Sequence, residues 1–222
     1  MEEVKILKNF EVVFVLDRSG SMGGKEDDTI GGFNSLLDKQ KELPGNVKVT
    51  TVLFDDEAVT LHDRMDLGSV PAMTKKDYFV RGCTAMWDAV GSTIQRISHL
   101  QDMESQENKS EKTLFIITTD GMENASTEYT GKQVRNLIES RKKDGWEFMF
   151  LGANIDAEDV AEDLGIDRNM AVKFENDAEG IRRNYHAVGS AMCCLRSCKK
   201  VKKDWKDDIE SHRNSKKQVR KN

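Results

Sequence analysis

The sequence has few cysteines and no long apolar run. Cys193, Cys194 and Cys198 crowd into one segment and Cys83 stands alone, which is not the spread framework of a disulfide-stabilised secreted domain, so we expect reduced thiols. No run of about 18 apolar residues is present, which predicts that no helix crosses a membrane. The N-terminal MEEVKILKNF has acids where a signal peptide has bases. These absences favour a cytoplasmic protein.

The chain also lacks an internal repeat and a long low-complexity linker. With 222 residues it is long enough for one α/β domain and an appendage. Residues 1–180 hold 21 Lys and Arg against 35 Asp and Glu, whereas residues 181–222 hold 13 against 4. We predict a domain over residues 1–198 and a flexible basic tail over 199–222, with disorder from residue 210. Such a tail can bind nucleic acid or an acidic partner, and it can equally be a solvated helix end that frays.

Apolar runs alternate with amphipathic stretches, a pattern typical of α/β proteins with a largely parallel sheet. Three runs are apolar almost throughout, as strands buried on both faces are: 12–16, 114–118 and 148–151. Residues 47–54 and 58–61 flank a short acidic turn, which predicts a hairpin and one antiparallel strand at the sheet edge.

Helices are expected between these strands, because apolar residues recur there at helical spacing: 29–42, 85–100, 131–143 and 156–164. A long last helix is expected from the stripe Ile181, Tyr185, Val188, Met192 and Leu195, which should pack on the sheet. Residues 101–112 are polar and predict an exposed loop. The predicted fold class is α/β, with a doubly wound, mostly parallel sheet, one antiparallel edge strand and helices on both faces.

Five oxygen-bearing side chains lie at or beside the carboxyl ends of predicted strands: Asp17, Ser19 and Ser21 in LDRSGSM, Thr84 in RGCTAMW, and Asp120 in IITTDGMEN. In open α/β sheets, ligands bind at this edge. Two close carboxylates repel each other unless a cation offsets their charge. Two carboxylates and three hydroxyls supply the oxygen ligands that Mg2+ prefers, with little excess charge. The pattern predicts a divalent-cation site, with Mg2+ favoured and Mn2+ or Ca2+ as alternatives.

In their order and spacing, these five residues resemble the metal-ion-dependent adhesion site (MIDAS) of von Willebrand factor A (VWA) domains, and the similarity runs over residues 11–174. The surrounding GCTA and TDG runs are typical of bacterial and phage members. The resemblance implies the Rossmann-like VWA fold. It also implies that Ser19 and Ser21 bind the metal directly, that Thr84 binds directly or through water, and that Asp17 and Asp120 act mostly through bound water.

The resemblance further implies a binding function rather than an enzyme, with no catalytic residue. One coordination position is left for an acidic side chain of a partner, so we expect a Mg2+-dependent protein-binding module. Prokaryotic relatives work beside ATPases or stress-response complexes, and a component of such a complex is the expected kind of partner. Gly20, Asn124 and Ser126 are candidate partner-binding rim residues, although Asn124 and Ser126 can equally bond their own backbone.

Two other functions fit less well. A phosphatase of the haloacid-dehalogenase type also places Mg2+ between aspartates at strand ends, but it needs a second aspartate two residues after the first, where Ser19 stands. Nucleic-acid binding through the basic tail would consist mostly of phosphate contacts. Only Trp205 offers an aromatic ring near the tail lysines, so a stacking platform is not evident.

Two local features have alternative interpretations. Cys194 and Cys198 are one helical turn apart and near His186, but structural zinc takes four ligands in Cys-x2–4-Cys pairs, which this segment does not supply. We interpret the clustered cysteines as buried small hydrophobic residues. Asp88 lies four residues after Thr84, and is either a neighbour of the site or an acid in the first turn of a helix, where the dipole favours it.

Overall fold

The computed structural model describes residues 6–219, which form a six-stranded sheet in the order β3-β2-β1-β4-β5-β6. The strands are β1 (Asn9–Asp17), β2 (Asn46–Phe54), β3 (Ala58–Asp66), β4 (Lys112–Thr119), β5 (Glu147–Ala153) and β6 (Ala171–Phe174). β3 pairs antiparallel with β2 at one edge, and every other pairing is parallel. The predicted doubly wound α/β fold is therefore confirmed.

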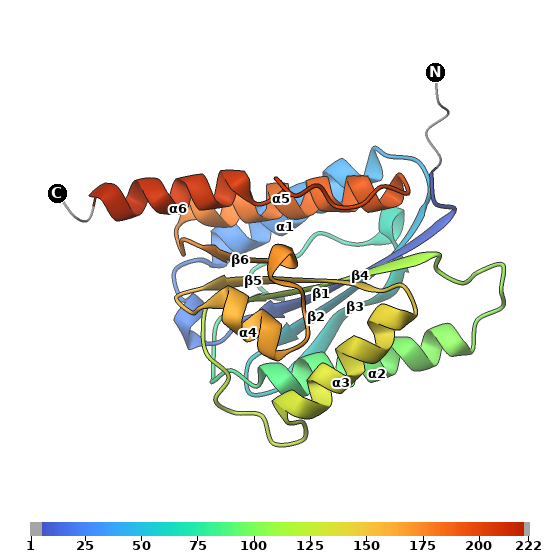
Figure 1. Ribbon diagram of the computed structural model, residues 1–222, viewed down its shortest axis with the longest axis horizontal. Helices are drawn as coiled ribbons and strands as arrows, with labels where there is room; N and C mark the ends of the chain where they lie inside the picture. Colours follow the sequence, from blue (N-terminus) through green and yellow to red (C-terminus); the bar gives the residue numbers. More distant parts are fainter. Residues whose placement is uncertain (1–5, 220–222) are drawn as a thin grey trace.

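Helices cover both faces of the sheet (Figure 1). One face carries α1 (Glu26–Lys41), α5 (Ala178–Arg196) and α6 (Asp207–Val219), and the other carries α2 (Met86–Asp102) and α3 (Gly131–Lys143). The short α4 (Ala157–Asp163) packs beside β5 and β6. None of the helices in the described range is long and apolar enough to cross a membrane.

β1 occupies the middle of the sheet, which explains its apolar sequence. It pairs with β2 on one side and β4 on the other, and it is buried from Phe10 to Asp17. Strand order reverses between β1 and β4, and this is the position where open α/β sheets bind ligands at the carboxyl edge. Leu16 pairs with Thr118, so the acid that ends β1 and the acid that follows β4 come to the same place.

The C-terminal segment differs from its predicted form. Residues 207–219 form α6, and this helix packs on β6 and α5. Ile209 is 1% exposed, and the indole Nε1 of Trp205 donates to the main-chain oxygen of Asn169 at 2.7 Å. The prediction of disorder from residue 210 is therefore wrong as far as residue 219, and residues 220–222 lie outside the described range. The division of the chain at residues 198 and 199 stays a prediction.

The cysteines also differ in part from their predicted role. All four are free thiols, as expected. However, Cys83 and Cys198 are exposed, and Cys193 and Cys194 are half-buried, so the buried-hydrophobe interpretation of the cluster is wrong for Cys198. Between residues 6 and 219 there is no group of three or more His, Cys, Asp or Glu side chains placed to hold a metal ion, so nothing supports zinc at this cluster.

Candidate metal site

Three loops meet at the carboxyl edge of the sheet and are tied together by main-chain hydrogen bonds. The loop after β1 is joined to the segment before α2, because the N–H of Gly20 donates to the oxygen of Gly82 at 3.2 Å and the N–H of Arg81 donates to the oxygen of Arg18 at 3.0 Å. The loop after β4 joins the same segment through the N–H of Asn124, which donates to the oxygen of Thr84 at 3.1 Å. The loops are therefore fixed relative to one another.

Asp17 is fixed at both of its carboxylate oxygens. Oδ1 accepts from the N–H of Ser19 at 2.7 Å, and Oδ2 accepts from the hydroxyl of Thr119 at 2.6 Å. Its main-chain oxygen accepts from the phenol of Tyr78 at 2.6 Å. Because Thr119 is the last residue of β4, this contact links the ends of the two central strands. The carboxylate is 1% exposed and points to the switch point rather than to bulk solvent.

A chain of short polar contacts connects the serines to Asp120. The hydroxyls of Ser19 and Ser21 lie 3.1 Å apart, and the Ser21 hydroxyl donates to Oδ1 of Asp120 at 2.5 Å. The second oxygen of Asp120, Oδ2, accepts from the amide of Asn176 at 2.7 Å. Four of the five predicted residues are thus connected through direct contacts, with Asp17 joined through the N–H of Ser19.

Thr84, the fifth predicted residue, reaches the same place beside Gly121. A Cβ added at Gly121 would lie 3.3 Å from Oγ1 of Thr84 and 3.4 Å from Oγ of Ser21. The two hydroxyls therefore flank the same small space, which a side chain at residue 121 would crowd. The N–H of Thr84 donates to Oδ1 of Asn124 at 2.9 Å, so the turn that carries the threonine is held from the opposite loop.

Gly82 allows the chain to reach Thr84. Its φ is +64°, and an added Cβ would lie 2.2 Å from Oδ2 of Asp56. Only glycine adopts this conformation without strain and leaves room for the carboxylate. That carboxylate in turn accepts from the N–H of Cys83 at 2.8 Å. The acidic hairpin turn thus supports the loop that presents Thr84.

The electrostatics of the cluster favour a cation. Asp17 and Asp120 are 1% and 2% exposed, and within residues 6–219 neither carboxylate forms an ion pair. Burial, above all, raises the pKa of both carboxyls, and the charge of Asp120 raises that of Asp17 further. Two buried carboxylates without a counter-charge are costly unless a bound cation compensates them. The donor set, two carboxylates and three hydroxyls, fits a hard divalent ion.

The basic side chain of Arg18 is held away from the cluster. Arg18 lies between Asp17 and Ser19 in the sequence, but its Nε donates to Oδ2 of Asp55 at 2.7 Å. Arg81 donates to the same oxygen at 2.8 Å. Asp55 therefore pairs with Arg18. Asp55 lies in the hairpin turn between β2 and β3, as the sequence predicted. Arg18 is therefore committed to Asp55 and does not pair with Asp17.

Comparisons with known proteins agree with this architecture. No family model matches the sequence, and no curated protein matches it. A solved structure of proximal thread matrix protein 1 from the mussel byssus, with zinc in its MIDAS motif, matches at 14% identity with a TM-score of 0.59, over 86% of this chain and 47% of that chain. The vWF domain of the type V pili tip protein Mfa5 from Porphyromonas gingivalis matches at 12% identity and a TM-score of 0.58, over 83% and 96%.

The chain has the fold of a von Willebrand factor A domain. Manganese-loaded TRAP protein from Plasmodium vivax matches as well, at 18% identity and a TM-score of 0.53, over 82% of this chain and 74% of that one. The chain spans about half the length of the mussel protein. At these identities the likeness establishes the VWA fold, and the site must be argued from the residues described above.

Within this VWA fold, two of the predicted rim residues have bracing roles. The side chain of Asn124 holds the main chain of Thr84. The hydroxyl of Ser126 accepts from the N–H of Asp88 at 3.1 Å and donates to Glu123 at 2.8 Å. Gly20 is exposed beside Ser21. Contact of these three residues with a partner stays a prediction.

Asp88 and Glu123 organise the loop after β4 around the start of α2. Asp88 accepts from the N–H groups of residues 127–129 at 2.7–2.9 Å. Glu123 accepts from the N–H groups of Trp87, Ala125 and Ser126 at 2.8–2.9 Å. Asp88 is thus an acid in the first turn of α2, and it also has a second role. It fixes the outer part of the loop that carries Asp120.

Sequence reasoning missed Thr119, Tyr78 and Asn176 as contacts of the acidic residues. Thr119 had a signal, because it directly precedes Asp120 at the end of an apolar run. Tyr78 and Asn176 lie in irregular segments 61 and 56 residues away from the acids that they contact, and no local pattern marks them. Only the folded chain brings them to the VWA-type edge.

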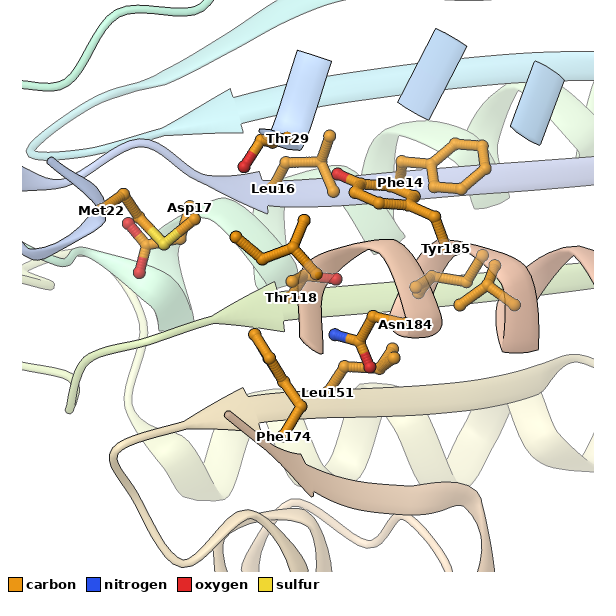
Figure 2. Close-up of a pocket in the computed structure, with 13 residues that line it drawn as sticks. Phe14, Leu16, Asp17, Met22, Thr29, Thr118, Leu151, Phe174, Asn184 and Tyr185 are labelled. Carbon is orange, nitrogen blue, oxygen red and sulfur yellow. The ribbon is translucent and has the colours of Figure 1, made fainter. Parts of the chain in front are cut away.

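A small cavity of about 20 Å3 lies between the sheet and the helices, directly beneath the site. Figure 2 shows Asp17 and Met22 at one end of it, with Asn184 and Tyr185 reaching in from α5. Three buried polar atoms at this cavity have no hydrogen-bond partner within residues 6–219: Thr29 Oγ1, Asn184 Oδ1 and Tyr185 OH. Asp17 is therefore held by hydrogen bonds from Ser19, Thr119 and Tyr78, whereas the cavity beside it is lined by polar atoms that lack partners among the described residues.

Proposed function

We propose that this protein is a Mg2+-dependent protein-binding module, in which the metal site captures an acidic side chain of a partner protein. The observation that carries the proposal is the pair of buried carboxylates, Asp17 and Asp120, which are connected through the Ser19 N–H and the two serine hydroxyls and lack an ion pair within the described residues. Burying both carboxylates without a counter-charge is costly, and a bound cation would offset that cost. Mn2+ and Ca2+ are the alternatives to Mg2+.

The chain's own residues have separate tasks at this site. The hydroxyls of Ser21 and Thr84 flank the same small space, the Ser19 hydroxyl contacts that of Ser21, and these three are the direct ligands in the proposal. Asp17 and Asp120 orient the Ser19 main chain and the Ser21 hydroxyl, and supply the negative charge. When bound, the ion supplies a positive charge that a partner carboxylate can approach. Ser21 is exposed whereas Ser19 is buried, so approach is expected from the Ser21 side.

The comparisons support a metal-dependent binding role without fixing the ion or the partner. The mussel protein is described with zinc in its MIDAS motif, and TRAP is described as manganese-loaded. The proposal further specifies Mg2+ as the ion and a carboxylate as the group that the partner contributes. It also specifies an ATPase or stress-response complex as the source of the partner, a bacterial or phage origin, and a cytoplasmic location. We propose no catalytic activity, because Ser19 stands where a phosphatase would need its acid–base aspartate.

Nucleic-acid binding through the C-terminal segment is a weaker alternative. Two of its lysines are engaged with the body of the protein, since Lys206 pairs with Glu158 and Lys216 pairs with Asp177. Trp205 is buried against Asn169 and offers no ring for base stacking. Binding of this kind would be independent of Mg2+ and would fall steeply with salt, so the two functions separate in one titration.

The test of the proposal is metal-dependent capture of a partner, followed by mutation of that partner. Wild type and a Ser19→Ala/Ser21→Ala variant are immobilised, and proteins are sought that bind wild type in Mg2+ and leave with EDTA. Acidic residues of a captured protein are then changed to alanine one at a time. The proposal predicts that one such change removes binding to the same extent as EDTA does.

The variant and one further result act as controls. The double serine variant should keep the fold, shown by an unchanged circular dichroism spectrum, and should capture none of the metal-dependent partners. The proposal is wrong if the partner binds equally in EDTA, or if the serine variant binds it normally.

A further inference from the structure

Asp120 receives a contact from a segment that the metal motif does not contain. Asn176 follows β6, and its Nδ2 donates to Oδ2 of Asp120 at 2.7 Å. Because Ser21 donates to Oδ1, both oxygens of the Asp120 carboxylate have a fixed direction. A carboxylate held at both oxygens loses little rotational freedom when it acts on a metal or its ligands, which favours binding.

In making this contact, the Asn176 side chain leaves its own amide oxygen without a hydrogen bond from any described residue. Its Oδ1 is buried, and within residues 6–219 it has no hydrogen-bond partner. A buried acceptor without a donor is unfavourable, and such atoms in native structures call for an explanation. If the Asn176 side chain turned toward solvent, its amide oxygen could accept a hydrogen bond from water. Its orientation is therefore set by Asp120.

The neighbouring residue, Asp177, is held by α6. Its side chain caps the start of α5, because Oδ1 accepts from the N–H of Gly180 at 2.8 Å. Nε2 of His212 lies 3.1 Å from Oδ1, and Nζ of Lys216 lies 2.9 Å from Oδ2. Both α6 residues therefore contact the segment that carries Asn176.

α6 is itself anchored, so it can serve as a fixed support. Ile209 is buried, Asp208 pairs with Arg183 of α5, and Arg213 donates to the main-chain oxygen of Lys173 in β6 at 3.5 Å. Figure 1 shows α6 lying over α5, with its C-terminal end toward the end of the molecule where α1 begins. The helix is placed to hold the segment between β6 and α5 from outside the sheet.

We propose that Asn176 is a positioning residue of the metal site, and that α6 keeps it in place by holding Asp177. The inference rests on the proposed metal function and extends it, because it makes the C-terminal helix part of the support of the site. Asn176 acts through Asp120, and His212 and Lys216 act through Asp177.

The first test compares Mn2+ affinity, measured by calorimetry, for wild type and Asn176→Ala. Loss of an outer partner of a metal site weakens affinity by about 10–100-fold, so we expect a loss of about tenfold. Asn176→Ser, which can restore a donor to Asp120, should recover part of it. In the metal-free protein, Asn176→Ala should also speed hydrogen exchange of the amides of residues 121–124, which follow Asp120.

The second test examines α6 with a matched pair of lysines. Lys216→Met removes the ion pair with Asp177, whereas Lys217→Met changes an exposed neighbour on the same helix. We expect Lys216→Met to weaken Mn2+ binding about two- to threefold, in line with a partly exposed ion pair, and Lys217→Met to leave it unchanged. Combined with Asn176→Ala, Lys216→Met should add nothing further, because both act along one path.

The results separate this inference from the proposed function. Unchanged Mn2+ affinity and unchanged amide exchange in Asn176→Ala would overturn the role of Asn176, and equal effects of the two lysine variants would overturn that of α6. If wild type bound no Mn2+, the proposed function would fail. Amide exchange in the metal-free variants would then still decide whether Asn176 and α6 position Asp120.

Discussion

Tyr78 donates its phenolic hydrogen to the main-chain oxygen of Asp17 at 2.6 Å, at the point where β1 ends. Burial raises the pKa of this phenol well above its ordinary value, so the donor stays protonated throughout the physiological range. Tyr185, also buried, has a hydroxyl without a partner among residues 6–219. Tyr78 contacts Asp17 directly, whereas Tyr185 lines the cavity beside it with this unpaired hydroxyl.

The tyrosine pair yields the first prediction. Tyr78→Phe should lower the free energy of unfolding by about 1–2 kcal/mol, because it leaves the buried oxygen of Asp17 without its donor. Tyr185→Phe should be neutral or slightly stabilising, since it removes an unpaired hydroxyl while keeping the ring. Urea unfolding of both variants checks this. An equal loss in Tyr185→Phe would show that its hydroxyl is satisfied, for example by a buried water.

The second prediction concerns Arg196, which closes the end of α1. The guanidinium is 3% exposed and donates to the main-chain oxygens of Gln40, Leu43 and Pro44 at 2.8–3.1 Å. Arg196→Met removes the side-chain donor of the Leu43 and Pro44 oxygens, so the free energy of unfolding should fall by about 2–4 kcal/mol.

A surface arginine of the same helix serves as the control for Arg196. Arg182 pairs with Glu179 three residues earlier and its side chain is 70% exposed. Arg182→Met should therefore change the free energy of unfolding by less than about 0.5 kcal/mol. Similar losses in both variants would contradict the special role of the buried guanidinium.

The third prediction is a pH dependence at Asp177. Burial alone would raise the pKa of this carboxyl, but the Gly180 N–H, Lys216 and His212 together lower it to about 2. The unfolded pKa is about 3.9, so the contribution of the ionised group is complete above that pH and is lost as pH falls through about 2. Asp177→Asn should lower the melting temperature most above pH 4.

At each pH, the melting temperature of Asp177→Asn is subtracted from that of wild type. The difference removes the effect of the other titrating carboxyls, which both proteins share. The gap between wild type and Asp177→Asn should narrow from pH 4 to pH 2. A gap that stays constant over this range would mean that the ionised form of Asp177 is not the stabilising one.

The sequence was sufficient to predict the elements that carry a clear local pattern, namely the buried apolar strands and the amphipathic helices between them. The predicted helix over 131–143 has the bounds of α3, whose first turn carries a capping box between Thr130 and Gln133. The apolar runs gave β1, β4 and β5, and with them the meeting of Asp17 and Asp120. α1 begins three residues before its predicted start at residue 29, and the acids at 26–28 form a favourable first turn.

What the sequence could not supply depends on tertiary contacts. α6 has weak amphipathic character, and it is fixed by the burial of Ile209 and Trp205 on elements formed by earlier parts of the chain. β6 is only Ala171–Phe174, too short for its pattern to be read. The Asn176 contact with Asp120 joins two irregular segments, and no spacing rule predicts such a pair.

The fourth prediction concerns the central claim, that Ser19, Ser21 and the two aspartates hold a divalent ion. The matched variant is Ser19→Ala/Ser21→Ala, which removes two proposed ligands. Asp17→Ala is a poorer choice, because it would also remove the acceptor of the Ser19 N–H and so disturb the loop itself. Binding to the native state alone stabilises it by mass action, by about 2.7 kcal/mol at one hundred times the dissociation constant.

The most direct measurement is thermal unfolding of wild type and of this double variant across a titration with Mg2+ and with Mn2+. The account predicts a melting temperature that rises with ion concentration in wild type and stays constant in the variant. No rise in wild type with either ion, or an equal rise in both proteins, would contradict it.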